Sequence, residues 1–304
     1  MSQGDPLSAG AYSILQAPLI EMVVNTFPEI TAAFFIDDGN MCGKLEQVVE
    51  AAKLYKWLGK AKLGNIANEA KSEAYCPTQL SEEAINTLND NGFEVIPPEK
   101  GIVIAGGPIG SDQFCIDYFN KKAHKIVDTM KVLKQMKSNP TGYTAASAQT
   151  ATFLLRMCPA QSFIYCLRVG LPEHTKEAAR IIDSAIFHNF FTLTDLIDLL
   201  PPDGTEQNGT IRGSTFLNLG RGGSGYGSSE LMRKALYMGS VAQTAMKVGE
   251  LVPRAKITTE HEANESTVWA AYNKALEDTQ RLLPDADLTH LSLTAIFAKP
   301  QEKV

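Results

Sequence analysis

The sequence of 304 residues has few of the features that mark secreted or membrane proteins. Its five cysteines are dispersed and odd in number, and no two of them have the C-x-x-C spacing of a zinc site. No apolar run approaches the length of a membrane span, and residues 1–6 lack the basic and apolar regions of a signal peptide. These absences predict reduced thiols, an intracellular location in the nucleus or the cytoplasm, and no membrane partner.

An excess of positive charge is also missing. The formal net charge is −6, and 20% of the residues are charged. A protein that coats DNA carries a basic surface, so this balance argues against that class while leaving room for a local basic groove. The hydrophobic content of 44% is ample for a globular core and predicts two or three subdomains.

The stretch with the clearest chemistry is a pair of adjacent carboxylates, Asp37 and Asp38, which follows an apolar run at residues 32–36. The run predicts a buried strand, residues 39–40 offer a tight turn, and a return strand is expected from residues 41–42. Such a hairpin presents both carboxylates at its tip. Two adjacent charges stay ionised most easily beside cations, which indicates a Mg²⁺ site for phosphoryl transfer. The alternative is an ordinary turn, because Asp, Gly and Asn favour turns for backbone reasons.

Helices and short strands are predicted on both sides of this pair. Ser8 is expected to cap a helix that Pro18 kinks and that ends before Pro28. An amphipathic helix is predicted over residues 43–59, and a strand that enters a glycine-rich turn over residues 102–110. The rest is predicted to be mainly helical from residue 112 onward, with helices at residues 145–157, 176–191 and 230–238.

Lysines flank the apolar face of the helix predicted from residue 112. They are Lys121, Lys122, Lys125, Lys131, Lys134 and Lys137. One interpretation is a solvated helix face. The other is a surface that follows a phosphate backbone, since a row of lysines neutralises charge without reading sequence.

A glycine-rich segment from Gly220 to Gly225 fits the pattern G-x-G-x-x-G. It follows a predicted strand at residues 215–219 and precedes the predicted helix at residues 230–238. A pyrophosphate could lie at that helix N-terminus, which would make the protein a nucleotide-binding oxidoreductase. No clear βαβ unit surrounds the segment, and Glu250 does not end an apolar strand, so a surface loop is the alternative.

Four segments in the first 110 residues together resemble the second half of a reverse transcriptase palm, of the non-LTR retrotransposon type. They are the Gln-Gly-Asp-Pro-Leu-Ser run at residues 3–8, Phe35-Ile36-Asp37-Asp38, the Gly-x-x-x-Asn-x-x-Lys-Ser segment at residues 64–72 and the glycine turn at residues 104–110. They occur in the family's order and at compatible spacing. Residues 221–228 are also similar to a glycine-rich segment beyond the thumb, which offers another explanation for those glycines.

The resemblance implies an α+β fold in three parts. A partial palm with a few strands, including the Asp-Asp hairpin, would span residues 1–111. A helical thumb-like region would span residues 112–200, and a helical C-terminal extension residues 201–304. The activity implied is RNA-directed DNA synthesis on an RNA template and a DNA primer, from dNTPs, by two-metal nucleotidyl transfer with Mg²⁺.

The resemblance also assigns roles to individual residues. Asp37 and Asp38 would hold Mg²⁺, and Lys71 would lie near the triphosphate as a proton donor or charge partner. The residues implied to line the nucleotide and template pocket are Gln3, Gly4 and Asp5. The residues implied to contact the primer are Gly106, Gly107, Lys121, Lys125 and Lys134.

The family's site also needs an aspartate on an earlier strand and a fingers region, and neither lies in residues 1–304. The chain alone is therefore expected to be inactive or nearly so, with an upstream fingers and palm segment as a partner. Bulky Ile36 and the negative net charge depart from the family as well. A second hypothesis is a non-catalytic nucleic-acid-binding or interaction protein on a palm–thumb scaffold, which rests on the lysines at residues 121–137.

Overall fold

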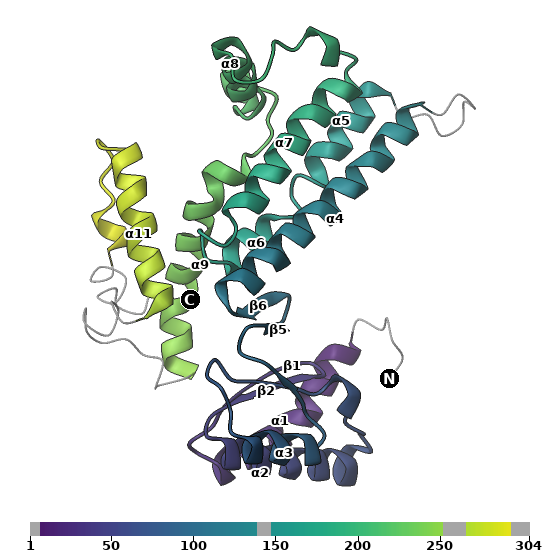
Figure 1. The fold of residues 1–304 in the computed structure, drawn as a ribbon, viewed down its shortest axis with the longest axis vertical. Coiled ribbons are helices and arrows are strands. Elements are labelled where there is room, and N and C mark those ends of the chain that lie inside the picture. Colours follow the sequence, from purple (N-terminus) through teal and green to yellow (C-terminus); the bar gives the residue numbers. More distant parts are fainter. Residues whose placement is uncertain (1–6, 139–146, 252–265, 293–304) are drawn as a thin grey trace. The chain divides into compact units, whose positions relative to one another are not determined.

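The computed structural model describes residues 7–138, 147–251 and 266–292. It is a mixed α+β structure with many helices and few short strands, as the sequence predicts (Figure 1). It divides into two compact units, Met1–Phe114 and Cys115–Val304. The division into three parts predicted from the sequence stays a prediction.

The first unit alternates helices with pairs of short strands. Its elements are α1 (Ser8–Thr26), β1 (Thr31–Phe35), β2 (Asp38–Cys42), α2 (Leu45–Leu58), a π-helical turn (Gly59–Leu63), a 3₁₀ turn (Glu69–Lys71), β3 (Glu73–Tyr75), α3 (Glu82–Asp90), β4 (Glu94–Ile96), β5 (Gly101–Ile104) and β6 (Gly107–Gly110). β1 and β2 form an antiparallel hairpin, β3 and β4 pair in parallel, and β5 and β6 form a second hairpin. Each of these sheets has only two strands and buries little apolar surface, so the helices supply most of the core of this unit.

That core lies between α1 and α2. Leu19 and Val23 of α1 pack with Ala51 and Leu58 of α2, and Ile30 joins the same cluster just before β1. The hairpin that carries the carboxylate pair is therefore attached to a two-helix layer rather than to a wide sheet.

The predicted cap of α1 needs correction. Ser8 is the first residue of the helix, and Leu7 holds the cap position without a side-chain hydrogen bond. The helix continues through Pro18, which lacks the N–H that would bond to the carbonyl of Ile14. Packing on α2 outweighs that missing hydrogen bond, because helices in proteins gain most of their stability from tertiary contacts.

The prediction that β1 is buried along its whole length is wrong. Phe34 is partly covered and packs on Tyr55 of α2, with ring centroids 4.9 Å apart, whereas Phe35 is 67% exposed. Helices cover one face of the hairpin, so alternate side chains are covered. Trp57 of α2, which lies within the helix predicted to be amphipathic, is likewise 63% exposed.

The second unit is helical. Its elements are α4 (Asp112–Ser138), whose first turn belongs to the first unit, α5 (Ala148–Met157), α6 (Ile164–Val169), α7 (Lys176–Leu193), a 3₁₀ turn (Ile197–Leu199), α8 (Glu206–Thr215), a 3₁₀ turn (Leu219–Arg221), α9 (Ser229–Leu251), α11 (Thr267–Leu282) and a 3₁₀ turn (Thr289–Leu291). The helices predicted from residue 112 onward are confirmed. None of the helices in the described ranges combines the length and the apolar character that crossing a membrane needs.

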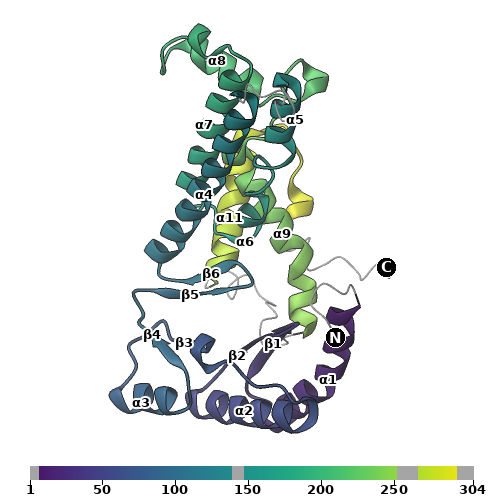
Figure 2. The ribbon, with the colours of Figure 1, turned by 90° about the vertical axis from the view of Figure 1, so that its right-hand side faces the viewer.

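Two apolar clusters hold the second unit together. The larger joins α4, α5 and α7 through fully buried side chains that include Phe119, Leu155 and Ile182. The smaller joins α9 and α11 through Tyr237 and Trp269. α7 contacts both α5 and α9, and α9 contacts α11, so these helices form a row from α5 to α11 (Figures 1 and 2).

Two buried tyrosines make the second unit sensitive to alkaline pH. The hydroxyl of Tyr226 donates to the carbonyl oxygen of Thr152, and that of Tyr237 to the carbonyl oxygen of Val268, each at 3.0 Å. Burial raises the pKa of each tyrosine to about 12. The unfolded chain releases these protons near pH ~10, so stability falls as the pH rises towards the folded pKa, by about 1.4 kcal/mol per pH unit and tyrosine.

We therefore expect Tyr226 and Tyr237 to ionise only when the second unit unfolds. The ultraviolet absorbance of tyrosinate, followed during an alkaline titration, measures this ionisation. Tyr237→Phe removes one of them and should make the loss of stability above pH ~10 less steep. An unchanged pH dependence in this variant would contradict the prediction.

Candidate functional site

The carboxylate pair lies at the end of the β1–β2 hairpin. Phe35 pairs with Asp38, so the loop between the strands consists of Ile36 and Asp37 alone. Ile36 has a φ of 54°, which is unfavourable for a β-branched residue, and Asp37 is not among the described residues with positive φ. A positive φ at the first loop position is the pattern of a type II′ turn, whose twist suits a hairpin. Asp37 therefore lies at the tip, and Asp38 begins β2.

The predicted turn included Gly39, but the turn lies at residues 36–37. Gly39 is a strand residue opposite Phe34, and a Cβ there would lie 2.6 Å from Cε1 of the Phe34 ring. Phe34 packs on Tyr55, whose hydroxyl accepts a hydrogen bond from Nε2 of Gln16 at 2.9 Å. Burial raises the pKa of Tyr55, which keeps its hydroxyl neutral. One chain of contacts thus links α1, α2 and the covered face of the hairpin.

Gly39→Ala should loosen this hairpin. The new methyl group would displace the Phe34 ring from its contact with Tyr55, at a cost of about 1–3 kcal/mol. Hydrogen exchange at the amides of β1 and β2 measures the effect. Gly10→Ala is the matched control, because a Cβ there meets nothing within 4 Å and lies in α1, where alanine favours the helix. Equal exchange rates in the two variants would argue against a supporting role for Phe34.

Both carboxylates are exposed, and among the described residues neither has an ion-pair or hydrogen-bond partner. Lys71, predicted to lie beside the triphosphate, is exposed at the end of a 3₁₀ turn, where its backbone N–H donates to Asn68 at 3.1 Å. It makes no hydrogen bond or ion pair with Asp37 or Asp38. The structure thus places Lys71 in the same unit without joining it to the carboxylates.

The carboxylate pair has the right chemistry for Mg²⁺ but too few ligands to hold it alone. Carboxylate oxygens are the ligands that Mg²⁺ prefers, and no cation of the described residues pairs with Asp37 or Asp38. Within the described ranges, no group of three or more His, Cys, Asp or Glu side chains lies close enough to bind a metal ion. The residues fit a site that is completed by water, substrate and a further carboxylate.

The glycine turn predicted near the primer forms the second hairpin. Ala105 and Gly106 have φ values of 48° and 79°, and two successive positive values indicate a type I′ turn. Gly107 is the first residue of β6, opposite Ile104. Residues 101–110 contain no charged side chain, so this hairpin can offer a partner only apolar contacts and backbone groups.

The structure separates the predicted lysines of α4. Lys121 and Lys125 lie one turn apart on one exposed stripe, and neither has an ion-pair partner among the described residues. Lys134 is exposed too, but it lies about 140° around the helix from Lys121. The other lysines make local contacts: Lys131 pairs with Asp128 at 2.6 Å, Lys137 pairs with Asp195 at 2.6 Å, and Lys122 lies over the Tyr118 ring at 5.3 Å.

A shallow cavity of about 390 Å³ in the first unit lies between α2 and the turn from α3 to β4. Nζ of Lys56 lies there, 3.1 Å from the Asn91 carbonyl oxygen, 3.4 Å from Glu69 and 5.0 Å from the centre of the Phe93 ring. None of the residues predicted to form the site lines this cavity.

Gln3, Gly4 and Asp5, predicted to line the nucleotide pocket, lie outside the described residues. No protein-family model, curated protein or solved structure matches this chain. Its function must therefore be inferred from its own residues and their geometry.

The strand predicted before the glycine-rich segment does not form. α8 ends at Thr215, and a 3₁₀ turn follows. Each backbone N–H from Gly220 to Gly225 donates to an oxygen of residues 214–219. These amides have no capacity left for a phosphate, so the geometry gives no support to a pyrophosphate site. The glycines serve the loop itself, since Gly222 has a φ of 80°.

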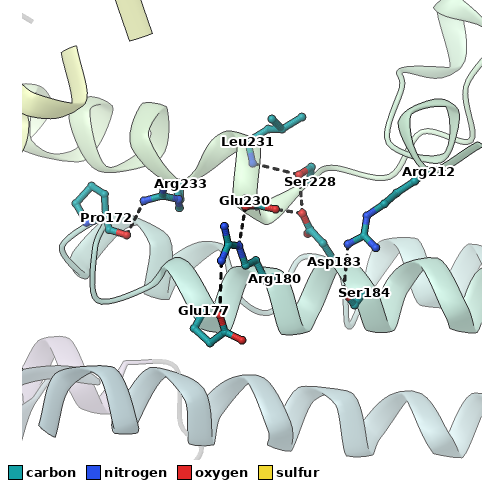
Figure 3. Close-up of polar contacts among 10 residues, drawn as sticks. All are labelled: Pro172, Glu177, Arg180, Asp183, Ser184, Arg212, Ser228, Glu230, Leu231 and Arg233. Atoms are coloured by element: carbon teal, nitrogen blue, oxygen red, sulfur yellow. Dashed lines mark hydrogen bonds and ion pairs between the residues drawn. The ribbon is translucent and has the colours of Figure 1, made fainter. Parts of the chain in front are cut away.

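The N-terminus of α9 is occupied by a carboxylate from α7 (Figure 3). Asp183 is 2% exposed and accepts hydrogen bonds from Oγ of Ser228 at 2.6 Å, the N–H of Ser229 at 2.7 Å and the N–H of Glu230 at 3.1 Å. Burial raises the pKa of Asp183, and these hydrogen bonds partly offset the rise. Sequence reasoning missed this residue. Its place on the apolar face of the helix predicted at residues 176–191 was the one available signal.

Further polar contacts surround this α7–α9 junction (Asp183, Ser228, Ser229 and Glu230). Nε of Arg180 lies 2.9 Å from Glu230, and a guanidinium nitrogen of the buried Arg233 donates to the carbonyl oxygen of Pro172 at 2.7 Å (Figure 3). These contacts join α7, α9 and the segment before α7. The junction is a structural element of the second unit.

Proposed function

We propose that this chain is the palm-and-thumb half of a reverse transcriptase-like nucleotidyltransferase of the non-LTR retrotransposon type. The observation that carries the proposal is the Asp37–Asp38 hairpin. Its two exposed carboxylates form no ion pair with any described residue, and helices support the hairpin on one face. The order of elements supports it. α1, the Asp-Asp hairpin, α2, the Lys71 segment, the β5–β6 hairpin and the long helix α4 follow one another as the resemblance implies.

In this function, Asp37 and Asp38 would contribute ligands to Mg²⁺. When bound, that ion lowers the pKa of a primer 3′-hydroxyl and stabilises the leaving pyrophosphate. The uncovered face of the hairpin would receive the end of the primer, because Phe35 and Asp38 form a cross-strand pair and point to the same side. The rigid turn at Ile36 would fix the direction of the Asp37 carboxylate.

The test combines binding with primer extension. The 304-residue chain, mixed with an RNA–DNA hybrid, Mg²⁺ and all four dNTPs, should bind the hybrid with an affinity that falls with salt, and should extend nothing. Joined to a fingers segment with the earlier aspartate-bearing strand, it should extend the primer. Robust extension by the chain alone that disappears in Asp37→Ala would overturn the expected inactivity. If the chain does not bind the hybrid and the joined chain does not extend the primer, the proposal is rejected.

A second candidate function, a non-catalytic nucleic-acid-binding protein on the same scaffold, rests on the stripe of Lys121 and Lys125. Two exposed cations one helical turn apart, neither paired with a described residue, can neutralise successive phosphates. Replacing both by glutamine should weaken hybrid binding and reduce the slope of log affinity against log salt by about 1–2. Lys131→Gln is the control, since Lys131 is already paired with Asp128. Hybrid binding that survives unchanged in the double variant would exclude the stripe of Lys121 and Lys125 as the binding surface.

A further inference from the structure

The second unit contains two segments that carry basic residues and no acidic ones. Residues 129–172 contain lysine and arginine, residues 207–229 contain arginine, and neither segment contains aspartate or glutamate, in a chain whose net charge is −6. The structure brings part of the two segments together. Tyr226, from the second segment, donates its hydroxyl hydrogen bond to Thr152 of α5, from the first.

The face they form carries an exposed aromatic ring and a guanidinium group. Phe153 of α5 is 52% exposed, and the guanidinium carbon of Arg156 lies 5.7 Å from the centre of its ring. A Cβ at Gly225 would come within 3.3 Å of a guanidinium nitrogen of Arg156, so the arginine lies between the ring and the glycine loop. Ring and guanidinium are therefore neighbours, and both groups can stack on a planar base.

The glycine loop extends this face. Leu219 lies next to Gly225, is 58% exposed and precedes the exposed Arg221 by two residues. Arg221 has no ion-pair partner among the described residues. An aromatic ring, a guanidinium beside it and a second arginine, which has no ion-pair partner among the described residues, thus lie on α5 and the adjoining glycine loop. We call this surface the α5–loop face (Phe153, Arg156, Leu219 and Arg221).

We propose that the α5–loop face binds single-stranded nucleic acid. Sequence-tolerant binding of a single strand needs stacking platforms for bases and cations for the backbone, and this face supplies both. It lies on elements other than the hairpins and the Lys121–Lys125 stripe to which the hybrid is assigned, so the inference goes beyond the proposed function. An acidic protein segment would use the arginines but would gain nothing specific from the flat face of Phe153.

Fluorescence anisotropy of a labelled single-stranded oligouridylate, about 12 nucleotides long, measures this binding to the full chain. Phe153→Ala should weaken binding about 10-fold, through lost base stacking. Arg221→Gln should weaken it and reduce the magnitude of the salt slope by about 0.7. Arg156→Lys keeps the charge and should leave that slope unchanged while lowering affinity, because an ammonium group cannot stack.

Two matched variants serve as controls. Met157→Ala removes another exposed apolar side chain from α5 that has no π face, and Arg168→Gln removes a cation from the same acid-free segment that is bonded to Gln243 instead. Both should bind the oligouridylate as the wild type does. Tryptophan fluorescence in a Trp57→Phe background, where Trp269 is the remaining tryptophan, verifies that every variant keeps the second unit folded.

No binding of the single strand at low salt would overturn the proposal, as would wild-type affinity in Phe153→Ala. An effect of Met157→Ala as large as that of Phe153→Ala would indicate an apolar surface for a protein partner. The result is independent of the hybrid-binding test, because the Lys121 and Lys125 variants should bind the single strand normally.

Discussion

Asp183→Ala is expected to lower the free energy of unfolding of the second unit by about 3 kcal/mol, because it leaves buried donors without an acceptor. The carboxylate receives one hydroxyl and two backbone N–H donors at the start of α9. Ser228 also caps α9, since its Oγ accepts from the N–H of Leu231 at 3.1 Å. Removal of the carboxylate would therefore disturb both the α7–α9 contact and the cap of α9.

The chain has two tryptophans, one in each unit, which makes this loss measurable. Trp57 is exposed in the first unit, so Trp57→Phe is a mild change that leaves the buried Trp269 as the reporter of the second unit. In that background, urea unfolding followed by tryptophan fluorescence gives the free energy for the second unit.

Two further variants sharpen the comparison. Asp183→Asn keeps one acceptor oxygen and should lose about half as much stability as the alanine variant. Glu177→Ala should change the free energy of unfolding by less than about 0.5 kcal/mol, because its ion pair with Arg180, at 3.9 Å, is exposed. An equal loss in the free energy of unfolding in Asp183→Ala and Glu177→Ala would contradict this prediction. It would mean that water accepts the hydrogen bonds that the Asp183 carboxylate accepts in the wild type.

Asp37→Ala is expected to reduce primer extension at least ~10³-fold in the chain joined to a fingers segment. Loss of a metal ligand removes several kcal/mol of transition-state stabilisation, and about 4 kcal/mol corresponds to that factor. Hybrid binding should be almost unchanged, because the carboxylate has no role in attracting phosphates. The expected signature is therefore a loss of rate at constant affinity.

Asp90→Ala controls for the loss of a carboxylate from the same unit, since Asp90 is exposed at the end of α3. It should extend the primer at the wild-type rate. A second diagnostic is the Mg²⁺ concentration needed for half-maximal extension, which should rise in Asp38→Asn if that residue is a ligand. Wild-type extension in Asp37→Ala would exclude the hairpin as the catalytic site.

Local sequence signals were sufficient for several of the helices and for the presence of the first hairpin, but not for α8 or for the residue at which β2 begins. Period and turn chemistry predicted the helices from residue 112 onward and the hairpin that carries Asp37 and Asp38, because these depend on neighbours in the sequence. The exact turn was misplaced. Gly39 reads as a turn residue from composition, but its lack of a side chain serves the cross-strand approach of Phe34, which no local pattern contains.

The same limit applies to the glycine-rich segment. The pattern from Gly220 to Gly225 matches a phosphate loop, and its spacing to the following helix is correct. The tertiary structure decided against that use, because the loop consumes its own amides and because Asp183 fills the helix N-terminus. Asp183 precedes Ser228 by 45 residues, so no sequence window joins them.

The sequence by itself determined the mainly helical content from residue 112 onward, the hairpin at the carboxylate pair and the strand that enters the glycine turn at residues 102–110, since each follows from residue order and local backbone preference. Only the tertiary structure decided which face of each element is covered. It left Phe35 and Phe153 exposed and buried Asp183. Burial depends on contacts between distant segments, and those contacts come into being only when the chain folds.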